Sequence, residues 1–259
     1  MSSLMYHIPG VRQLQAKLNQ LTSYVPPPPR VAATQGQESL KILLVHAHPD
    51  PVNSYSAAIA KQVETSAKEA GHEVRRISLY KTSTNSKARV DDYQPKLTAQ
   101  EHAHQHARGT NVDQRDLAPE IKEYVRLLQW CDTLVFVYPT WWMNTPAALK
   151  GFFDRALVHD LCWSLPNTVT NPDQSTSTTG LIPKLTNISQ IVGISTYGAP
   201  WHIVTLAGDN GRRMIANAIR PITSPSATVA WLGLYGMDET TNVQRTDFLK
   251  EVDNMVKRL

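Results

Sequence analysis

The stretch DTLVFVYPTWWMNTPAALKGFFDRAL, residues 132–157, decides how this chain folds. Its first part, DTLVFVYP, is a continuous apolar run, which predicts a strand covered on both faces. A turn with two prolines and two adjacent tryptophans follows, and the apolar spacing of PAALKGFFDRAL then predicts a helix. A buried strand, a turn and a helix in this order form the repeating unit of a parallel α/β sheet.

The same unit recurs on both sides of this stretch. Strands are predicted at KILLVHAHP, EVRRISLY, ISQIVGISTYG and TVAWLGLYG, which are residues 41–49, 73–80, 188–198 and 228–236. Helices are predicted at 54–70, 119–130, 206–219 and 243–258. Residues 81–118 are polar, with Pro95 and a histidine-rich patch, and residues 164–190 are predicted as a long loop or excursion. We therefore expect a doubly wound, five-stranded parallel sheet in a three-layer α/β/α arrangement.

Composition narrows the function classes. The chain has 259 residues, of which 41% are hydrophobic, enough for one large α/β domain with a sizeable core. The net charge of +4 and the pI near 9.0 come without a dense run of Lys and Arg, so nucleic-acid binding is not expected. Only two cysteines occur, and no apolar run approaches the ~20 residues of a membrane span. We expect a cytoplasmic protein without stable membrane insertion.

The first 39 residues differ in character from the rest. We predict an N-terminal arm at 1–39 and a main domain at 40–259. Apolar residues at helical spacing predict a short amphipathic helix in the arm, and the run Pro26–Pro29 predicts an extended linker. The arm is open to two interpretations: a membrane-surface or targeting element, or a helix that packs on its own domain or on a partner. Its few cations favour the second.

In an open α/β sheet, ligands bind beyond the carboxyl ends of the strands, where the strand order reverses. Three predicted turns lie there: HAHPDPVNSYS, YPTWWMNTP and STYGAPW. In the first, Asn53, Ser54 and Ser56 stand at the start of a helix, so hydroxyls and backbone N–H groups form an anion site suited to phosphate. Helix capping alone is the other explanation of these residues.

The second and third turns are rich in aromatic side chains. Trp141 and Trp142 lie in a loop at the binding edge, where large aromatics are costly unless they are buried or cover a flat ligand. The third turn, Thr196–Tyr197–Gly198, adds a hydroxyl, a second aromatic wall and a small residue that permits close backbone approach. This edge therefore suits a flat ligand that carries phosphate.

A metal site is the other hypothesis for the first turn. His46, His48 and Asp50 would supply the ligands, because the two histidines point to the same face at strand spacing. No further cluster of histidines or carboxylates completes such a site. The histidine-rich segment at 102–106 is better explained as a solvated face. We predict no metal.

Three segments together resemble the flavodoxin-like NAD(P)H dehydrogenases (quinone), the group that includes the DT-diaphorase type of enzyme. That family's A-H-P followed by S-F-N or S-F-S corresponds to LLVHAHPDPVNSYSAAIA, with Ser54–Tyr55–Ser56 in the second place. Its P-x-x-W-x-x-x-P-A-x-L-K-G-W-x-D-R corresponds to YPTWWMNTPAALKGFFDRAL, and its T-x-G-G or T-Y-G-G corresponds to STYGAPW. The resemblance covers about residues 40–258, and the middle segment is the most specific.

The resemblance implies a flavin, FMN or FAD, held by the three turns, with NAD(P)H as the electron donor. It places the flavin phosphate or pyrophosphate near His48, Ser54, Tyr55 and Ser56. It places one side of the isoalloxazine ring along Pro139, Thr140, Trp141, Trp142 and Met143. It places the pyrimidine end of the ring near Ser195, Thr196, Tyr197 and Gly198. Trp142 and Tyr197 would bound the pocket in which nicotinamide and quinone alternate on the ring.

The sequence departs from the family at the residues that assist hydride transfer. In the diaphorase branch a Tyr and a His follow the third turn, whereas Trp201 and Ala207 stand at those positions here. His202 lies nearby in the sequence and is our candidate for a catalytic replacement. Arg212 and Arg213, in GDNGRRMI, either meet a phosphate of the donor or belong to a surface ion-pair cluster or a dimer face.

The activity that the resemblance implies is a two-electron transfer. Hydride passes from NAD(P)H to a quinone or a similar electron-poor acceptor by a ping-pong mechanism. Relatives of this kind are usually homodimers, so a homodimer is expected. The missing Tyr and His leave a second function open, namely a flavin-carrying electron-transfer or regulatory subunit without quinone reductase activity.

Overall fold

A computed structural model describes residues 39–80, 96–106, 117–165 and 181–259. Five strands form one parallel sheet in the order β2–β1–β3–β6–β7. Their bounds are β1 Lys41–His46, β2 Glu73–Ser78, β3 Thr133–Thr140, β6 Gln190–Tyr197 and β7 Thr228–Tyr235. The predicted doubly wound, five-stranded parallel sheet is confirmed.

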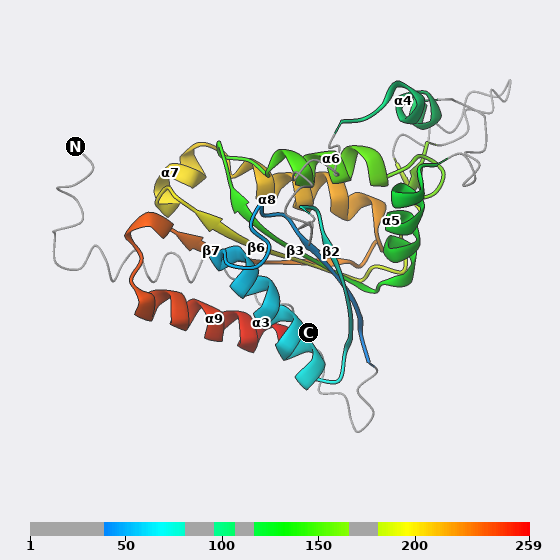
Figure 1. The fold of residues 1–259 in the computed structure, drawn as a ribbon. Coiled ribbons are helices and arrows are strands. Elements are labelled where there is room, and N and C mark those ends of the chain that lie inside the picture. Colours follow the sequence, from blue (N-terminus) through cyan, green and yellow to red (C-terminus); the bar gives the residue numbers. More distant parts are fainter. Residues whose placement is uncertain (1–38, 81–95, 107–116, 166–180) are drawn as a thin grey trace, which may run out of the picture.

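Helices cover both faces of this sheet (Figure 1). On one face lie α3 (Tyr55–Glu69) and α9 (Asn242–Val256); on the other lie α5 (Pro119–Trp130) and α6 (Ala147–Ala156). Successive side chains of a strand point to opposite faces, so β1 contributes to two apolar clusters. Ile42 and Leu44 pack with α3 and α9, and Leu43 and Val45 pack with α5 and α6. The three-layer α/β/α arrangement follows.

The prediction of a single helix at 206–219 is wrong. The structure has α7 at Trp201–Leu206 and α8 at Asn210–Met214, followed by a π-helical turn at Ile215–Ile219 and a 3₁₀ turn at Arg220–Ile222. The break lies at Gly208 and Asp209, which have φ of 97° and 43°. A right-handed helix cannot continue through two residues of positive φ, so the chain changes direction there.

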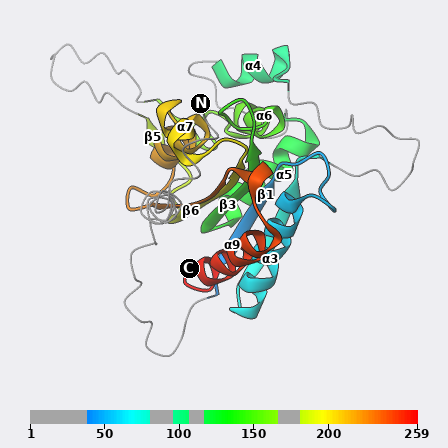
Figure 2. The same ribbon diagram turned by 90° about the vertical axis from the view of Figure 1, so that its left-hand side faces the viewer.

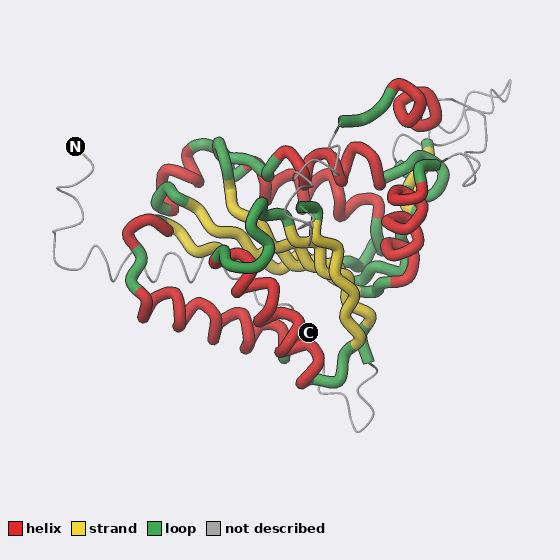
Figure 3. Tube along the Cα trace, viewed as in Figure 1, coloured by secondary structure: helices red, strands yellow, loops and turns green. Residues whose placement is uncertain are grey.

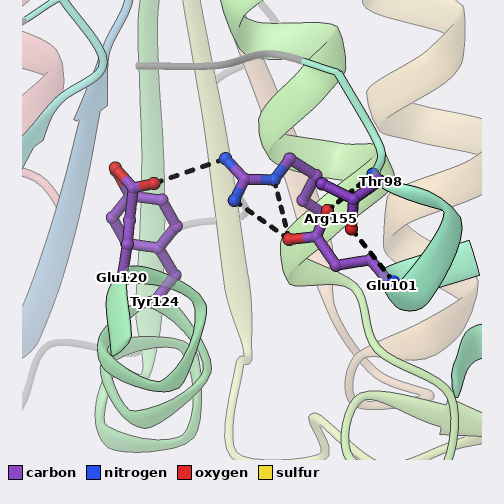
Figure 4. A network of polar contacts seen from close by, with 5 residues as sticks. All are labelled: Thr98, Glu101, Glu120, Tyr124 and Arg155. Carbon is purple, nitrogen blue, oxygen red and sulfur yellow. Dashed lines mark hydrogen bonds and ion pairs between the residues drawn. The ribbon is translucent and has the colours of Figure 1, made fainter. Parts of the chain in front are cut away.

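The polar segment 81–118, for which the sequence predicted no helix or strand, contains a helix, α4 (Ala99–His106). One buried ion-pair network holds it against the domain (Figure 4). Arg155 of α6 donates through Nε to Glu101 of α4 at 3.0 Å and through Nη1 to Glu120 of α5 at 3.3 Å. Tyr124 in turn donates its hydroxyl to Glu120 at 2.9 Å. A polar helix of eight residues is thus tied to the domain by charge.

Two further predictions concern segments outside the main sheet. The segment 164–190, predicted as a loop, includes a short strand, β5 (Ile182–Pro183). This strand pairs antiparallel with β4 (Trp163–Ser164). The predicted amphipathic helix and linker of the arm lie outside the described residues, apart from Ser39. Within the described ranges, no helix combines the length and the apolar character that crossing a membrane requires.

The carboxyl ends of β1, β3 and β6 meet at one edge of the sheet. After β1 the chain moves outward to β2 and then returns past β1 to β3, so the strand order reverses between β1 and β3. This edge is the side of Figure 1 on which α3 begins and α7 lies, and Figure 2 turns it toward the viewer. Figure 3 shows in green the loops that leave the strands there. Ligands of doubly wound folds bind at such a reversal.

Candidate functional site

The loop after β1 is fixed by its own hydrogen bonds. The Asp50 carboxylate accepts from the backbone N–H groups of Val52 and Asn53 at 3.1 and 2.8 Å. These bonds, that of Asn53 first, hold the pKa of Asp50 below its ordinary value. Ser54 donates its hydroxyl to the Asp50 carbonyl at 2.6 Å and accepts from Ala57 N–H at 3.1 Å. Ser54 is therefore the N-cap of α3, so the capping role weighed from the sequence is present.

The next two residues, Tyr55 and Ser56, face in different directions. The Tyr55 hydroxyl donates to the Arg245 carbonyl at 2.7 Å, and its ring packs beside Phe248 of α9. Ser56 is buried and meets His46, the last residue of β1. The backbone N–H groups of both belong to the first turn of α3, where the helix itself provides no acceptors. That turn offers an anion N–H donors and the positive end of the helix dipole.

The turn after β3 has an unusual backbone. Trp141 and Asn144 exchange two backbone hydrogen bonds of 3.0 Å, and the two residues between them, Trp142 and Met143, have φ of 50° and 58°. Positive φ at both central positions defines a type I′ turn, which normally contains Asn and Gly. Trp142 is 100% exposed. Backbone strain and a fully exposed tryptophan coincide at the reversal of the sheet, where strain points to function.

Side-chain contacts connect this turn to its neighbours. The rings of His48 and Trp141 lie 6.1 Å apart, which joins the loop after β1 to the turn after β3. Asn210, at the start of α8, donates from Nδ2 to the Met143 carbonyl at 3.3 Å. The hydroxyls of Thr140 and Ser195 lie 2.8 Å apart and fasten the ends of β3 and β6 to each other. The structure therefore brings the residues of the three predicted turns to one edge.

Tyr197 does not have the place that the sequence suggested. The side chain is 1% exposed, and its ring stacks on Tyr235 with centroids 4.3 Å apart. Its hydroxyl donates to Asp209 at 3.1 Å and accepts from Trp231 Nε1 at 3.1 Å. A ring packed in this way is not a wall of an open pocket, because the Tyr235 ring of β7 already covers its face. Only the backbone of Tyr197 reaches the edge.

The remaining residues predicted around the third turn fall into two groups. Thr196 is buried and Gly198 is exposed, at the end of β6. His202 is exposed on α7, beyond the turn. Pro139 and Ser195 are buried inside the sheet edge, and Ser195 donates to the Tyr138 carbonyl at 2.9 Å. The edge thus presents Gly198 and the tryptophan turn to the surface and keeps the hydroxyls beneath them.

Sequence reasoning missed a buried polar cluster behind the third turn. It consists of Tyr138, Tyr197, Asp209, Trp231 and Tyr235. Burial raises the pKa of Asp209, and burial together with the Asp209 charge and neighbouring tyrosines raises those of Tyr138 and Tyr197 well above the ordinary value. The one signal in the sequence was the presence of tyrosine and tryptophan, aromatic residues with a polar group, in the apolar strands β3, β6 and β7.

The histidines of the first turn do not act together. His46 is completely buried, with Nδ1 2.8 Å from Arg76 Nη2 and Nε2 3.2 Å from the Ser56 hydroxyl. His48 is half-buried, and its Nδ1 lies 3.0 Å from the Asp50 backbone N–H. Within the described residues, no three His, Cys, Asp or Glu side chains are grouped as metal ligands.

Burial of His46 makes stability depend on pH. Burial, with the charges of Arg76 and His48, lowers the pKa of His46 from 6.5 to about 3. Between these values the unfolded chain binds a proton that the folded chain excludes. Stability is therefore full above about pH 6.5 and falls as the pH drops, by up to about 1.4 kcal/mol per pH unit from this group.

Urea unfolding measured between about pH 7 and about pH 5 checks this prediction. The control is His46→Leu, which removes the titrating ring and should flatten the slope relative to the unsubstituted protein. Equal slopes in the two proteins would contradict the assignment to His46.

A family model described as a flavodoxin-like fold matches residues 40–221. Among curated proteins, an uncharacterized NAD(P)H oxidoreductase of Haemophilus influenzae is 30% identical over 125 residues, which are 48% of this chain and 54% of that protein. A ribosyldihydronicotinamide dehydrogenase [quinone] of Pongo abelii is 28% identical over 127 residues, which are 49% and 54% of the two chains. The chain thus spans about half the length of the curated relatives it matches.

Solved structures are similar over a larger part of the chain. A Streptococcus mutans protein is 27% identical with a TM-score of 0.64, covering 85% of this chain and 100% of its own. An FMN-dependent NADH-azoreductase of Bacillus anthracis, in complex with FMN, is 17% identical with a TM-score of 0.62, covering 85% and 98%. The second likeness is one of fold.

Proposed function

Because the chain belongs to the family of the flavodoxin-like fold, we propose that it is a flavin-dependent oxidoreductase. It transfers two electrons, as hydride, from NAD(P)H to a quinone or a similar electron-poor acceptor by a ping-pong mechanism. The observation that carries this proposal is the strained turn at Trp142 and Met143, which holds an aromatic ring fully exposed at the reversal of the sheet. The names of the two curated relatives, an NAD(P)H oxidoreductase and a ribosyldihydronicotinamide dehydrogenase [quinone], support an oxidoreductase with a nicotinamide donor.

The donor groups at this edge fit a flavin. A flat ring with a polar edge needs hydrogen-bond donors beside an aromatic surface, and its phosphate needs a cationic or dipolar site. In a type I′ turn, the N–H groups of the two central residues take no part in the turn's own hydrogen bonds. Those of Trp142 and Met143 therefore suit the polar edge of the ring, and the first turn of α3 suits the phosphate.

Several of the predicted site residues have specific tasks in this proposal. Trp142 covers the ring and excludes water, while Thr140 and Ser195 fix the distance between the ends of β3 and β6. The backbone of Thr196, Tyr197 and Gly198 holds the pyrimidine end. A bound flavin, FMN or FAD, would supply the redox chemistry, taking hydride from NAD(P)H and passing it to the acceptor in alternate half-reactions. His202 remains our candidate for a catalytic residue near the donor.

The assembly and location belong to the same proposal. We propose a homodimer in the cytoplasm. The two cysteines, Cys131 and Cys162, are buried and unpaired, and burial raises the pKa of each thiol to about 12. Such thiols suit a reducing compartment, because they neither form disulfides nor react readily.

The experiment that tests the proposal begins with visible absorbance. The purified protein should be yellow, or become so with added FMN or FAD, and heat denaturation should release the flavin for identification. Stopped-flow mixing with NADPH should bleach the absorbance, and a quinone should restore it. A colourless protein that binds neither flavin overturns the proposal; a flavoprotein that is not bleached by either nicotinamide favours the electron-transfer or regulatory subunit instead.

A second prediction concerns the strained turn itself. Replacing Trp142 by Asn together with Met143 by Gly installs residues that tolerate positive φ, so the free energy of unfolding should rise by about 1 kcal/mol. Flavin affinity should fall at the same time, because the exposed ring is lost. Urea unfolding and flavin titration measure the two effects.

The single variant Met143→Gly is the control for this prediction, because it relaxes the backbone and retains Trp142. It should keep the affinity for flavin. An unchanged affinity in the double variant as well would show that Trp142 does not cover the ligand.

A further inference from the structure

Three side chains from three separate elements meet beneath the start of α3. His46 is the last residue of β1, Ser56 lies in the first turn of α3, and Arg76 belongs to β2. Arg76 Nη2 lies 2.8 Å from His46 Nδ1, and His46 Nε2 lies 3.2 Å from Ser56 Oγ. His46 and Ser56 are buried, at 0% and 4% exposure. The three groups therefore form one continuous chain of hydrogen bonds, in which His46 and Ser56 are shielded from water and the Arg76 side chain is 23% exposed.

The chemistry of Arg76 fixes the direction of these bonds. A guanidinium has only donors, so His46 Nδ1 must accept from Arg76. The ring is neutral, since burial lowers the pKa of His46 to about 3, and a neutral imidazole has one N–H. That hydrogen must lie on Nε2, so His46 donates to Ser56 Oγ. The tautomer with hydrogen on Nδ1 would place two donors 2.8 Å apart.

The Ser56 hydroxyl then has its own hydrogen left to donate. In the part of the chain that the structure describes, Ser56 Oγ has no hydrogen-bond partner besides His46. The side chain of a helical residue points toward the N-terminus of its helix, which directs this hydroxyl to the first turn of α3. The acceptor that suits that place is an anion, because the first-turn N–H groups and the helix dipole favour negative charge.

Arg76 also contacts the loop after β1, which lies next to these three hydrogen-bonded side chains. Its Nη2 donates to the Pro51 carbonyl at 3.4 Å, and its Nη1 lies 3.6 Å from the Glu64 carboxylate on α3. One guanidinium thus joins β2 to the loop after β1 and to the helix that follows the loop. Its position is set before any ligand arrives, which lowers the ordering cost of binding.

We propose that Arg76 and His46 are positioning residues that commit the Ser56 hydroxyl to donate to the phosphate of the flavin. Arg76 sets the tautomer of His46, His46 donates to one lone pair of the Ser56 hydroxyl oxygen, and Ser56 donates its hydrogen to a phosphate oxygen at the start of α3. This relay, which consists of Arg76, His46 and Ser56, rests on the proposed flavin function. It adds two residues to that function, Arg76 and His46, neither of which touches the ligand.

The first test needs no ligand. ¹⁵N NMR of the histidine side chains in the ligand-free protein should show one ring with hydrogen on Nε2 and none on Nδ1, unchanged down to about pH 5. The signal is assigned by its absence in His46→Leu. A ring with hydrogen on Nδ1, or one that protonates near the ordinary pKa of histidine, overturns the relay whether or not the protein binds flavin.

The second test separates the phosphate from the ring. The affinities of the apoprotein for FMN and for riboflavin, which lacks the phosphate, are measured by quenching of flavin fluorescence. Arg76→Met and Ser56→Ala should each weaken FMN binding by about tenfold and leave riboflavin binding within about twofold. The double variant should lose little more than either single one, because the two residues act in one chain.

Arg75→Met is the matched control. Arg75 is the neighbouring residue of β2, pairs with Glu73 at 3.0 Å and covers the Trp130 ring, so the variant removes the same charge without touching His46. It should bind FMN as the unsubstituted protein does. Equal losses for FMN and riboflavin in Arg76→Met, or equal losses in Arg75→Met and Arg76→Met, overturn the relay alone; an unsubstituted protein that binds neither FMN, FAD nor riboflavin overturns the flavin function as well.

Discussion

Replacing Arg155 by Met is expected to lower the free energy of unfolding by about 3–5 kcal/mol. The Arg155 and Glu101 side chains are only 7% and 10% exposed, and they meet at 2.9 Å. Burial alone would raise the pKa of Glu101, but the hydrogen bond from Arg155 keeps it below the ordinary value, so the carboxylate is charged. Methionine fills much of the space of arginine and leaves that charge buried without its partner. Urea unfolding at neutral pH measures the loss.

Arg126→Met is the control for this prediction. Arg126 pairs with Glu123 at 2.6 Å on the outer side of α5, where both side chains are about half exposed. Exposed pairs of this kind contribute at most about 1 kcal/mol, so the variant should lose little stability. Similar losses of unfolding free energy in the two variants would show that the buried ion-pair network stabilises the protein no more than an exposed ion pair does. The comparison isolates burial, since both variants remove one arginine and one ion pair.

Replacing Gly193 by Ala is expected to destabilise the protein by about 3 kcal/mol. Gly193 lies in the middle of β6, and a Cβ there would overlap the ring of Trp231 on β7. Trp231 is 1% exposed and donates to the Tyr197 hydroxyl, so it cannot move without displacing the residue that leads into the third turn. Flavin affinity should fall together with stability. Thermal unfolding and flavin titration measure the two losses.

A second substitution distinguishes the overlap from a general effect on the strand. Trp231→Leu removes the ring that the new methyl group would meet. The double variant with Gly193→Ala should lose less stability than the sum of the losses in the two single variants. The reason is that the clash with the Trp231 ring occurs in Gly193→Ala alone and is absent from the double variant. Strictly additive losses would mean that Gly193 is needed for a reason other than room for Trp231.

Much of the fold was predictable because local patterns agree with it. The helix expected at 119–130 has those bounds in the structure, since Pro119 begins it and a buried strand follows closely. The single helix expected at 206–219 was wrong. Its apolar spacing is helical, but Gly208 and Asp209 take positive φ, which the spacing of apolar residues does not reveal.

The candidate site was predictable in its backbone and much less in its side chains. The three turns were found because ligands bind where strands of a doubly wound sheet end. Tyr197 was expected to face a ligand, but it stacks on Tyr235, from a strand about forty residues later. Whether a side chain at the end of a strand faces out or in depends on the neighbouring strand, which the local sequence does not contain.

The tryptophan-bearing stretch at 132–157 determined the most by itself. Its apolar run, its turn and its helical spacing are local properties, and they predict a buried strand followed by a helix on any parallel sheet. The tertiary structure alone decided the contacts between distant residues. Arg155 meets Glu101 across 54 residues, and Arg76 meets His46 across 30. Such contacts depend on how layers stack, so the charge that stabilises α4 and the relay beneath α3 appear only once the sheet has formed.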